Sequence, residues 1–131
     1  MTNIISDVKN YIDNNITVYS SLLIDYLQAN NNELMIRHEP SNVVETRYMD
    51  GSRIGMFNFS ITAKNLDSKV AIDQLNLITN ELDLVDNLVL DESLTFVNVE
   101  ASTGTRLISK TDKQEFIYSI TFILEYKTRR K

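Results

Sequence analysis

The amino-acid sequence predicts an α+β domain with a mainly antiparallel sheet of about four strands, a long β-hairpin and two or three flanking helices. Three observations lead to this fold class. The segments 2–14 and 67–84 have apolar residues at helical spacing. The segments 94–101 and 115–127 alternate as strands do. An Asp-Gly pair, Asp50-Gly51, lies between two extended runs and is typical of a tight hairpin loop.

The composition bounds the class of protein. The chain has 131 residues, the size of one domain, so we expect a single domain over residues 1–131. It contains no cysteine, which excludes disulfides, iron–sulfur clusters and thiolate zinc sites. The N-terminus has no signal-peptide pattern, and no stretch reaches the ~20 apolar residues of a membrane span. We therefore expect a soluble protein, made in the cytoplasm, with no cofactor.

The first third of the chain gives one clear element. An amphipathic helix is predicted for 2–14, with its apolar residues within about a third of the circumference. These apolar residues are Ile4, Ile5, Val8, Tyr11 and Ile12. The segment 16–27 fits neither the helical nor the strand period. After a turn at 30–32, residues 33–37 form a short strand candidate that Pro40 stops.

The clearest local signal is a hairpin from Val43 to Lys64. A two-residue loop at Asp50-Gly51 places Tyr48 opposite Arg53. The apolar base of the same face, Phe57–Ala63, is expected in the core. The polar tip of the hairpin is expected to leave the core.

The helix at 67–84 has two apolar stripes. The first stripe has the spacing of a core face and consists of Ala71, Leu75, Ile78 and Leu82. The second is rotated by roughly a third of a turn and consists of Val70, Leu77 and Leu84. Gln74 and Glu81 lie between the stripes. We expect a helix that is covered on two sides.

The last third is predicted as a strand at 94–101, a loop at 103–114 and a long strand at 115–127. One face of the long strand carries only large apolar or aromatic residues, whereas the other face is mixed. These residues are Phe116, Tyr118, Ile120, Phe122, Leu124 and Tyr126.

The charge is negative overall and unevenly distributed. A net charge of −5 argues against a general nucleic-acid binder. The segment 81–92 carries five acidic and no basic residues, whereas the segment 127–131 carries four basic residues. These are either two solvated charge runs or complementary patches on different copies of one protein.

No set of residues has the pattern of a catalytic or metal site. His38 is the only histidine and has no nucleophile elbow or other triad context. The acidic residues from Asp83 to Glu92 lack the spacing and the glycine of a calcium loop. Gly51 and Gly55 do not complete a phosphate-binding pattern. We therefore expect an assembly or binding protein and not an enzyme.

The candidate binding surfaces are the hairpin tip, the second helix stripe and the 103–114 loop. Tyr48 and Arg53 are in position for a cation–π contact across the hairpin. The candidate interface residues are Tyr48, Met49, Arg53, Val70, Leu77, Leu84, Arg106, Lys110 and Lys113.

Two blocks of the sequence resemble a known family. The first runs from Val44 to Phe59, and the second from Ser109 to Tyr118, with Leu124-Glu125-Tyr126 following. The helix between them begins in register with the family pattern at Asp67–Ile72. The chain resembles the tail terminator or minor capsid proteins of long-tailed, siphovirus-type bacteriophages, over roughly residues 36–127. The segment 16–35 is least similar.

The resemblance implies a function in assembly. It implies an antiparallel sheet flanked by helices, and a homo-oligomeric ring, usually a hexamer, that caps the tail tube and stops its polymerisation. The implied partners are the major tail tube protein and a head-side connector protein, with no membrane contact. The implied location is the head-proximal end of the virion tail, after assembly in the host cytoplasm. Genomic DNA would pass through without specific binding, which suits an acidic lumen that repels phosphates.

Two alternatives stay open. The first alternative is that the chain is a neighbouring protein of the phage particle, either a head–tail joining (neck) protein or a tail tube protein. The remaining alternative, from another class, is a monomeric cytoplasmic binding module or small enzyme.

Overall fold

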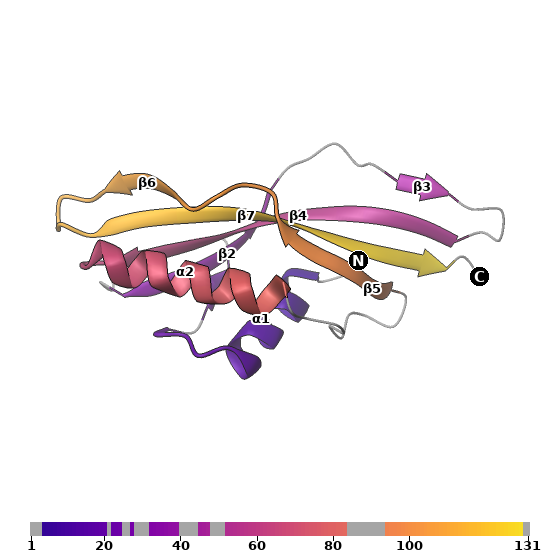
Figure 1. Cartoon of the computed structure of the whole chain (residues 1–131), viewed down its shortest axis with the longest axis horizontal. Helices are drawn as coiled ribbons and strands as arrows, with labels where there is room; N and C mark the ends of the chain where they lie inside the picture. Colours follow the sequence, from indigo (N-terminus) through magenta and orange to yellow (C-terminus); the bar gives the residue numbers. More distant parts are fainter. Residues whose placement is uncertain are drawn as a thin grey trace.

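The computed structural model describes residues 4–20, 22–24, 27, 32–39, 45–47, 52–83 and 94–129. In these residues, two helices pack on a mixed, mostly antiparallel sheet of seven strands (Figure 1). In chain order the elements are α1 (Ile4–Asn15), β1 (Leu22–Ile24), β2 (Glu33–His38), β3 (Glu45–Arg47), β4 (Ser52–Asn65), α2 (Ser68–Asp83), β5 (Leu94–Ala101), β6 (Arg106–Lys110) and β7 (Phe116–Arg129). The α+β class is confirmed, but the predicted number of strands was too small.

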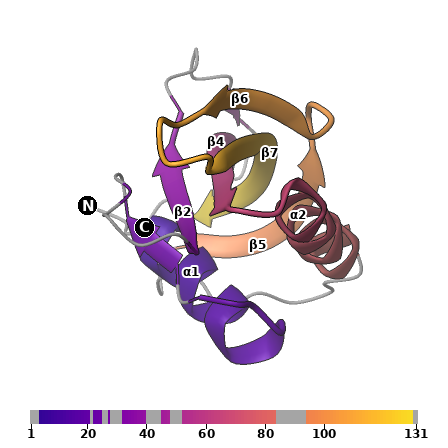
Figure 2. The same cartoon turned by 90° about the vertical axis from the view of Figure 1, so that its left-hand side faces the viewer.

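The sheet is built around a long antiparallel ribbon of β4 and β7, which have 14 residues each. The ribbon is paired without a break from Ser52–Arg129 to Asn65–Phe116. Short strands line both of its edges: β2 and β3 pair with β4, and β5 and β6 pair with β7 (Figure 2). β1 adds to β2 in parallel and is the one parallel pairing among the described strands. Long-range pairing therefore dominates the fold.

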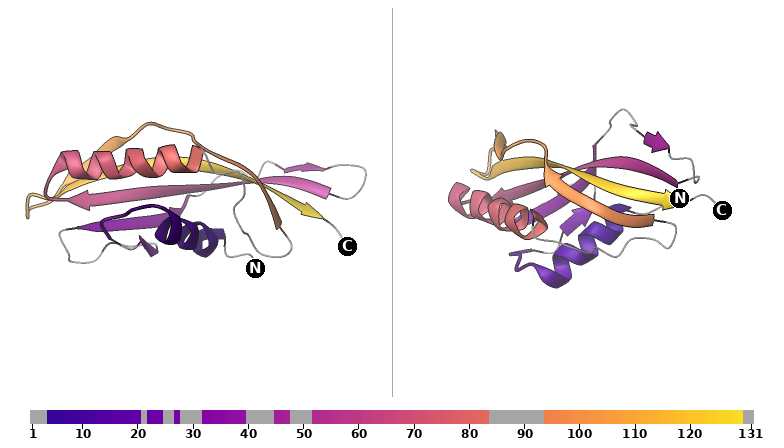
Figure 3. Two further views of the ribbon diagram at one scale, coloured as in Figure 1. Left: turned by 60° about the horizontal axis from the view of Figure 1, so that its bottom comes forward. Right: turned by 45° about the vertical axis from the view of Figure 1, so that its right-hand side comes forward.

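Both helices contribute to one hydrophobic core. The predicted face of α1 is buried through Ile4, Val8 and Ile12, and the helix ends at Asn15 as expected. The predicted core stripe of α2 is also confirmed, since Ala71, Leu75, Ile78 and Leu82 are at most 1% exposed. These side chains meet the apolar face of the sheet, which consists of Leu34, Ile36, Phe59, Ile61, Ala63, Ile120, Phe122 and Leu124. Figure 3 shows α2 lying along the ribbon.

Side-chain capping fixes the start of α2. The Asp67 carboxylate accepts a hydrogen bond of 3.0 Å from the Lys69 backbone N–H, which otherwise has no partner within the helix. The Asn65 side chain accepts a bond of 2.9 Å from the Asp67 N–H. The end of β4 is thus joined to α2 by a tight polar turn.

The predicted hairpin register was wrong by one residue. Arg53 lies opposite Arg47 and not opposite Tyr48. Glu45 and Arg47 therefore share a face with Gly55 and Arg53, because a one-residue shift moves every side chain to the other face. The observed pairing of Arg47 with Arg53 does not fit a two-residue loop at Asp50-Gly51, which would place Tyr48 opposite Arg53. The ribbon with β7 and the core contacts of its inner half hold β4 in place, and these outweigh a local turn preference. Asp50-Gly51, Tyr48 and Met49 lie outside the described residues.

The predicted loop at 103–114 contains a strand, β6. All five of its side chains are exposed, so its sequence carries no alternating burial pattern. β6 forms because the edge of β7 offers unpaired backbone groups that its own N–H and C=O groups satisfy. The ambiguous segment 16–27 contains the short strand β1, preceded by the buried Ile16.

Candidate subunit interface

The outer face of α2 carries large apolar side chains that no described element covers. Val70 is 40% exposed and Leu77 is 38% exposed, although Leu75 and Ile78 beside them are completely buried. Val70 and Leu77 therefore lie outside the core, as a separate stripe. Because no described element covers this stripe, the expectation of a helix covered on two sides stays a prediction. Leu84, the third member of the stripe, lies outside the described residues.

Gln74 lies between the stripes, and the structure shows what it does there. Its side chain is only 8% exposed. The Oε1 atom accepts a bond of 2.9 Å from the Tyr19 N–H, and the Nε2 atom donates one of 3.1 Å to the Thr17 carbonyl. Gln74 therefore holds the 17–19 segment against α2, so this side of the helix has an internal partner and the Val70–Leu77 side has none described.

β6 presents a second exposed apolar surface. Leu107 is 53% exposed and Ile108 is 51% exposed, the highest values among the large hydrophobic residues of the described ranges. A β-bulge lies between Leu107 and Ser109, because Leu107 pairs with Tyr118 whereas Ser109 pairs with Ile117. A bulge interrupts the alternation of side chains along a strand. All five residues of β6 are exposed, so Leu107 and Ile108 both lie outside the core.

The turn after β6 is held by a compact set of hydrogen bonds. The Thr111 N–H donates to the Glu115 carbonyl at 2.8 Å, and the Gln114 N–H donates to the Thr111 carbonyl at 3.0 Å. The Thr111 hydroxyl donates to the Glu115 carboxylate at 2.9 Å. Gln114 takes a positive φ of 66°, which closes the turn. The turn therefore holds β6 in a defined position against β7.

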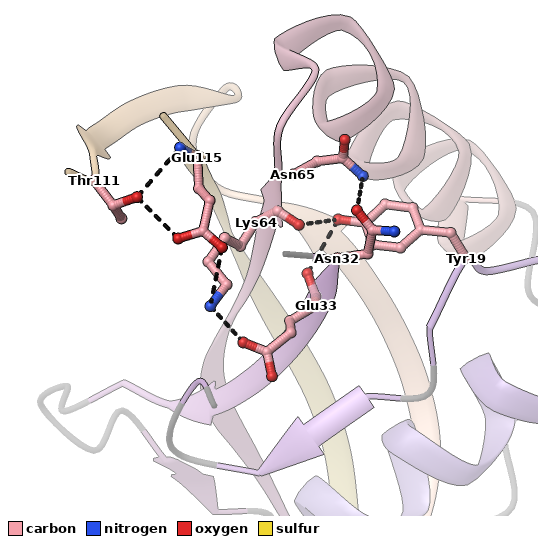
Figure 4. Close-up of polar contacts among 7 residues, drawn as sticks. All are labelled: Tyr19, Asn32, Glu33, Lys64, Asn65, Thr111 and Glu115. Carbon is pink, nitrogen blue, oxygen red and sulfur yellow. Dashed lines mark hydrogen bonds and ion pairs between the residues drawn. The ribbon is translucent and has the colours of Figure 1, made fainter. Parts of the chain in front are cut away.

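A buried ionic cluster fastens this turn to the sheet (Figure 4). The Lys64 ammonium lies 2.6 Å from a Glu33 carboxylate oxygen and 3.9 Å from a Glu115 carboxylate oxygen. The three residues are between 1% and 5% exposed. Lys64 and Glu33 are cross-strand partners in β4 and β2, while Glu115 directly precedes β7. One lysine thus links three segments that are distant in sequence.

Tyr19 closes the other side of this region. Its hydroxyl lies 3.0 Å from the carbonyl oxygens of both Glu33 and Lys64, to which it donates its proton. Burial raises the pKa of the Tyr19 hydroxyl far above its ordinary value, and the nearby Glu33 carboxylate adds to the rise. The Asn65 amide donates to the Asn32 side chain at 3.1 Å and completes the polar layer shown in Figure 4.

The opposite end of the ribbon has different chemistry. Arg47 of β3 pairs with Arg53 of β4, and Lys127 of β7 pairs with Ile54 of β4. Gly55 lies under the ring of Tyr126, where an added Cβ would come within 2.6 Å of the Cζ and Oη atoms. Only a residue without a side chain allows the ring this close approach.

The predicted interface residues fall into separate places. Val70 and Leu77 lie together on α2, whereas Arg106, Lys110 and Lys113 are exposed on β6 and the following turn. Lys110 lies over the Phe116 ring, with its ammonium 5.0 Å from the ring centroid. Arg53 is in the ribbon end, and the proposed contact between Tyr48 and Arg53 lies outside the described residues.

Sequence reasoning missed two features of this region: the exposed apolar pair of β6 and the buried ionic cluster. Leu107 and Ile108 were included in a loop, although two adjacent large apolar residues in a polar segment were a usable signal. Glu33 and Lys64 were placed in strands without any assigned role. No spacing along the chain links them to Glu115, because only the strand pairing brings them together.

The described residues show no other arrangement for chemistry. His38 is exposed at the end of β2 and stacks on Phe57, with ring centroids 4.6 Å apart. Within those residues, no group of three or more His, Cys, Asp or Glu side chains is arranged to hold a metal ion. Among the described helices, neither has the length and apolar character to cross a membrane.

Comparison with known families identifies the chain. The family model of the bacteriophage tail terminator protein matches residues 11–128, which include α2, β1 to β6 and all of β7 except its last residue. The chain belongs to the bacteriophage tail terminator family. The resemblance found in the sequence is thereby confirmed. Tail terminators are structural proteins of the virion tail, so the expectation that this chain is not an enzyme is confirmed as well.

A solved structure supports the fold of this tail terminator. A chain from the virion of a native gene transfer agent (GTA) particle superposes with a TM-score of 0.59 at 12% sequence identity. The match covers 82% of this chain and 79% of that chain. At such low identity the likeness establishes the fold alone. No curated protein matches the sequence.

Proposed function

We propose that this tail terminator forms a closed ring that caps the tail tube, stops tube polymerisation and provides the surface for head–tail joining. The observation that carries the proposal is the family match over residues 11–128. The ring lies at the head-proximal end of the tail. In this family it is usually a hexamer. Its partners are the major tail tube protein on one side and a head-side connector protein on the other, and genomic DNA passes through it.

The exposed apolar surfaces support a ring. A closed ring with cyclic symmetry needs two different surfaces on each subunit, because each contact joins one surface to the other on the next copy. The chain has exposed apolar side chains on α2 and on β6, which are separate elements. Apolar residues that gather on a surface mark contact sites more often than scattered ones do.

Electron microscopy of tails made without this protein tests the termination role. We expect overlong tails of variable length, because nothing stops the tube. If the chain were a neck protein, tails of normal length without heads would form. If it were a tail tube protein, no tails would form. Either of these two results would contradict the proposal.

Sedimentation and circular dichroism of Leu77→Asp test the involvement of α2. We expect a folded protein that assembles poorly, because a carboxylate is desolvated only when the neighbouring subunit arrives. Asn76→Asp, at the next position and also exposed, is the matched control and should assemble normally. An unfolded Leu77→Asp protein would place Leu77 in the core. A folded variant that assembles normally would exclude α2 from the interface.

A further inference from the structure

We propose that the outer face of α2 docks on β6 of the next copy, and that this contact closes the ring. The inference rests on the proposed ring and names the two surfaces that meet in it. The α2 patch consists of Val70, Asp73, Leu77 and Glu81. The β6 patch consists of Leu107, Ile108, Lys110 and Lys113.

The two patches have the same arrangement of apolar and charged residues. Each has two large apolar side chains, between 38% and 53% exposed. Each is bordered by charged residues at exposed or half-buried positions. Burying apolar side chains in the centre while charges remain at the rim is the usual organisation of a protein interface.

The charges of the patches are opposite, which selects the partner. The segment 67–83 contains four acidic residues and one basic residue, and both charges in the α2 patch are negative. Both charges in the β6 patch are positive. Two α2 patches would repel each other, and so would two β6 patches, whereas an α2 patch attracts a β6 patch. The contact is therefore heterologous, as ring closure requires.

The lengths of the patches also agree. Val70 and Leu77 are seven positions apart on a helix and lie about 10 Å apart along its axis. Leu107 and Lys110 are three positions apart on a strand and lie about 10 Å apart. The strand part of the β6 patch is therefore about as long as the distance between the two apolar residues of the α2 patch.

Both patches are held in position before assembly. Asp67 caps α2, and Gln74 ties it to the 17–19 segment. The 111–115 turn and the Glu115–Lys64 ion pair hold β6 in position. In Figure 1, α2 and β6 lie on different sides of β7, so one subunit can use both at once. Preformed surfaces lose little entropy on binding, which favours a stable contact.

Site-specific cross-linking tests the contact directly, because the chain has no cysteine. We expect a short bismaleimide to join Leu77→Cys to Ile108→Cys in an equimolar mixture of the two variants. Each variant alone should give no covalent dimer. A chain with both cysteines should give a ladder of covalent multimers that ends at the size of the ring.

Matched controls separate this contact from random collision. Asn76→Cys lies on an exposed side of α2 outside the patch, and Glu100→Cys lies on an exposed position of β5. Asn76→Cys with Ile108→Cys, and Leu77→Cys with Glu100→Cys, should remain monomeric on a denaturing gel. Circular dichroism and native mass spectrometry of each variant, without cross-linker, should show the native fold and the ring.

The outcomes distinguish this inference from the proposed function. A dimer from either single variant would mean that like patches meet, and would overturn the inference. Rings without a Leu77–Ile108 cross-link would also overturn it, but would leave the termination role intact. A wild-type protein that forms no ring in solution or on tails would overturn both.

Charge exchange gives a second, independent test. Lys110→Glu and Asp73→Lys should each weaken ring formation about tenfold, because each brings like charges together at the contact. The double variant should return to within about threefold of the wild type, since the pair is restored with reversed sign. Two single effects that add without any rescue would overturn the pairing of these patches.

Discussion

The two ends of the β4–β7 ribbon share one hydrogen-bonded ladder but differ in their surroundings. At the covered end, every residue of β4 from Phe59 to Asn65 is buried, with the apolar core on one face and the Lys64 cluster on the other. At the open end, residues 52–56 and 125–129 pair only with each other and with β3 and β5. Met56, in β4, is already 37% exposed there.

From this difference in burial we expect the two ends to differ in stability, although their backbone pairing is continuous. Local stability follows buried side-chain contacts, so one ladder can open at one end and stay closed at the other. The covered end fixes the fold. The open end contributes less to the core, as the exposure of Met56 indicates.

The largest expected effect is the loss of Lys64. Lys64→Ala removes the cation between two buried carboxylates and should lower the free energy of unfolding by about 3–5 kcal/mol. Lys127→Ala, on the same ribbon at the half-buried open end, should cost less than about 1 kcal/mol. Urea denaturation measures both. Equal losses would mean that the two ends do not differ in stability.

The next effect compares neighbouring residues of the helix that covers the ribbon. Ile78→Ala should cost about 2–5 kcal/mol, because it leaves a cavity in a packed core. Leu77→Ala should cost about 0.5 kcal/mol or less in the isolated subunit, since its side chain is on the surface. Thermal unfolding at a concentration where the protein is monomeric tests this. Comparable losses would place Leu77 in the core.

A smaller effect belongs to the open end. Gly55→Ala places a methyl group against the Tyr126 ring and should cost about 1–3 kcal/mol. Tyr126→Leu replaces the ring with a smaller, flexible side chain. In the double variant of Gly55→Ala and Tyr126→Leu it should remove most of this cost, with a coupling energy of about 0.5–3 kcal/mol. Additive losses in the double-mutant cycle would show that the ring is not what limits position 55.

The smallest effect concerns Tyr19 and depends on pH. Tyr19→Phe should cost about 0.5–1.5 kcal/mol at neutral pH, the net value of a hydrogen bond. Because burial raises the pKa of Tyr19 in the folded state, the folded protein keeps a proton that the unfolded chain loses above about pH 10. The wild type should therefore lose its advantage over Tyr19→Phe as the pH rises above about 10. Urea denaturation across this range measures it, and a constant difference would contradict the burial of a neutral hydroxyl.

Sequence reasoning succeeded for elements whose apolar residues recur at helical or strand spacing because they face the hydrophobic core. The α2 stripe through Leu75 and the β7 face through Phe122 were predicted because both bury their side chains in that core. β6 was missed because an edge strand with five exposed side chains has no such period. The hairpin register was wrong because distant pairing with β7 outweighs the local turn signal.

The candidate interface was predictable only in part, for the same reason. The exposure of Val70 and Leu77 follows from helix geometry, so periodicity was sufficient to place them on one face. The β6 surface depends on pairing with the edge of β7, and the ionic cluster joins β2, β4 and the residue before β7, which are far apart in the sequence. Neither arises from local spacing.

The position of β7 in the chain has a consequence for how subunits are made. β7 pairs with β4, β5 and β6, all of which the ribosome synthesises before it. When β4 is synthesised, the edge that pairs with β7 has no partner. This edge stays unpaired while α2, β5 and β6 are synthesised. Folding dominated by such distant pairing is slow, and the waiting edge is open to pairing with other chains. The complete sheet can therefore form only after β7 has been translated.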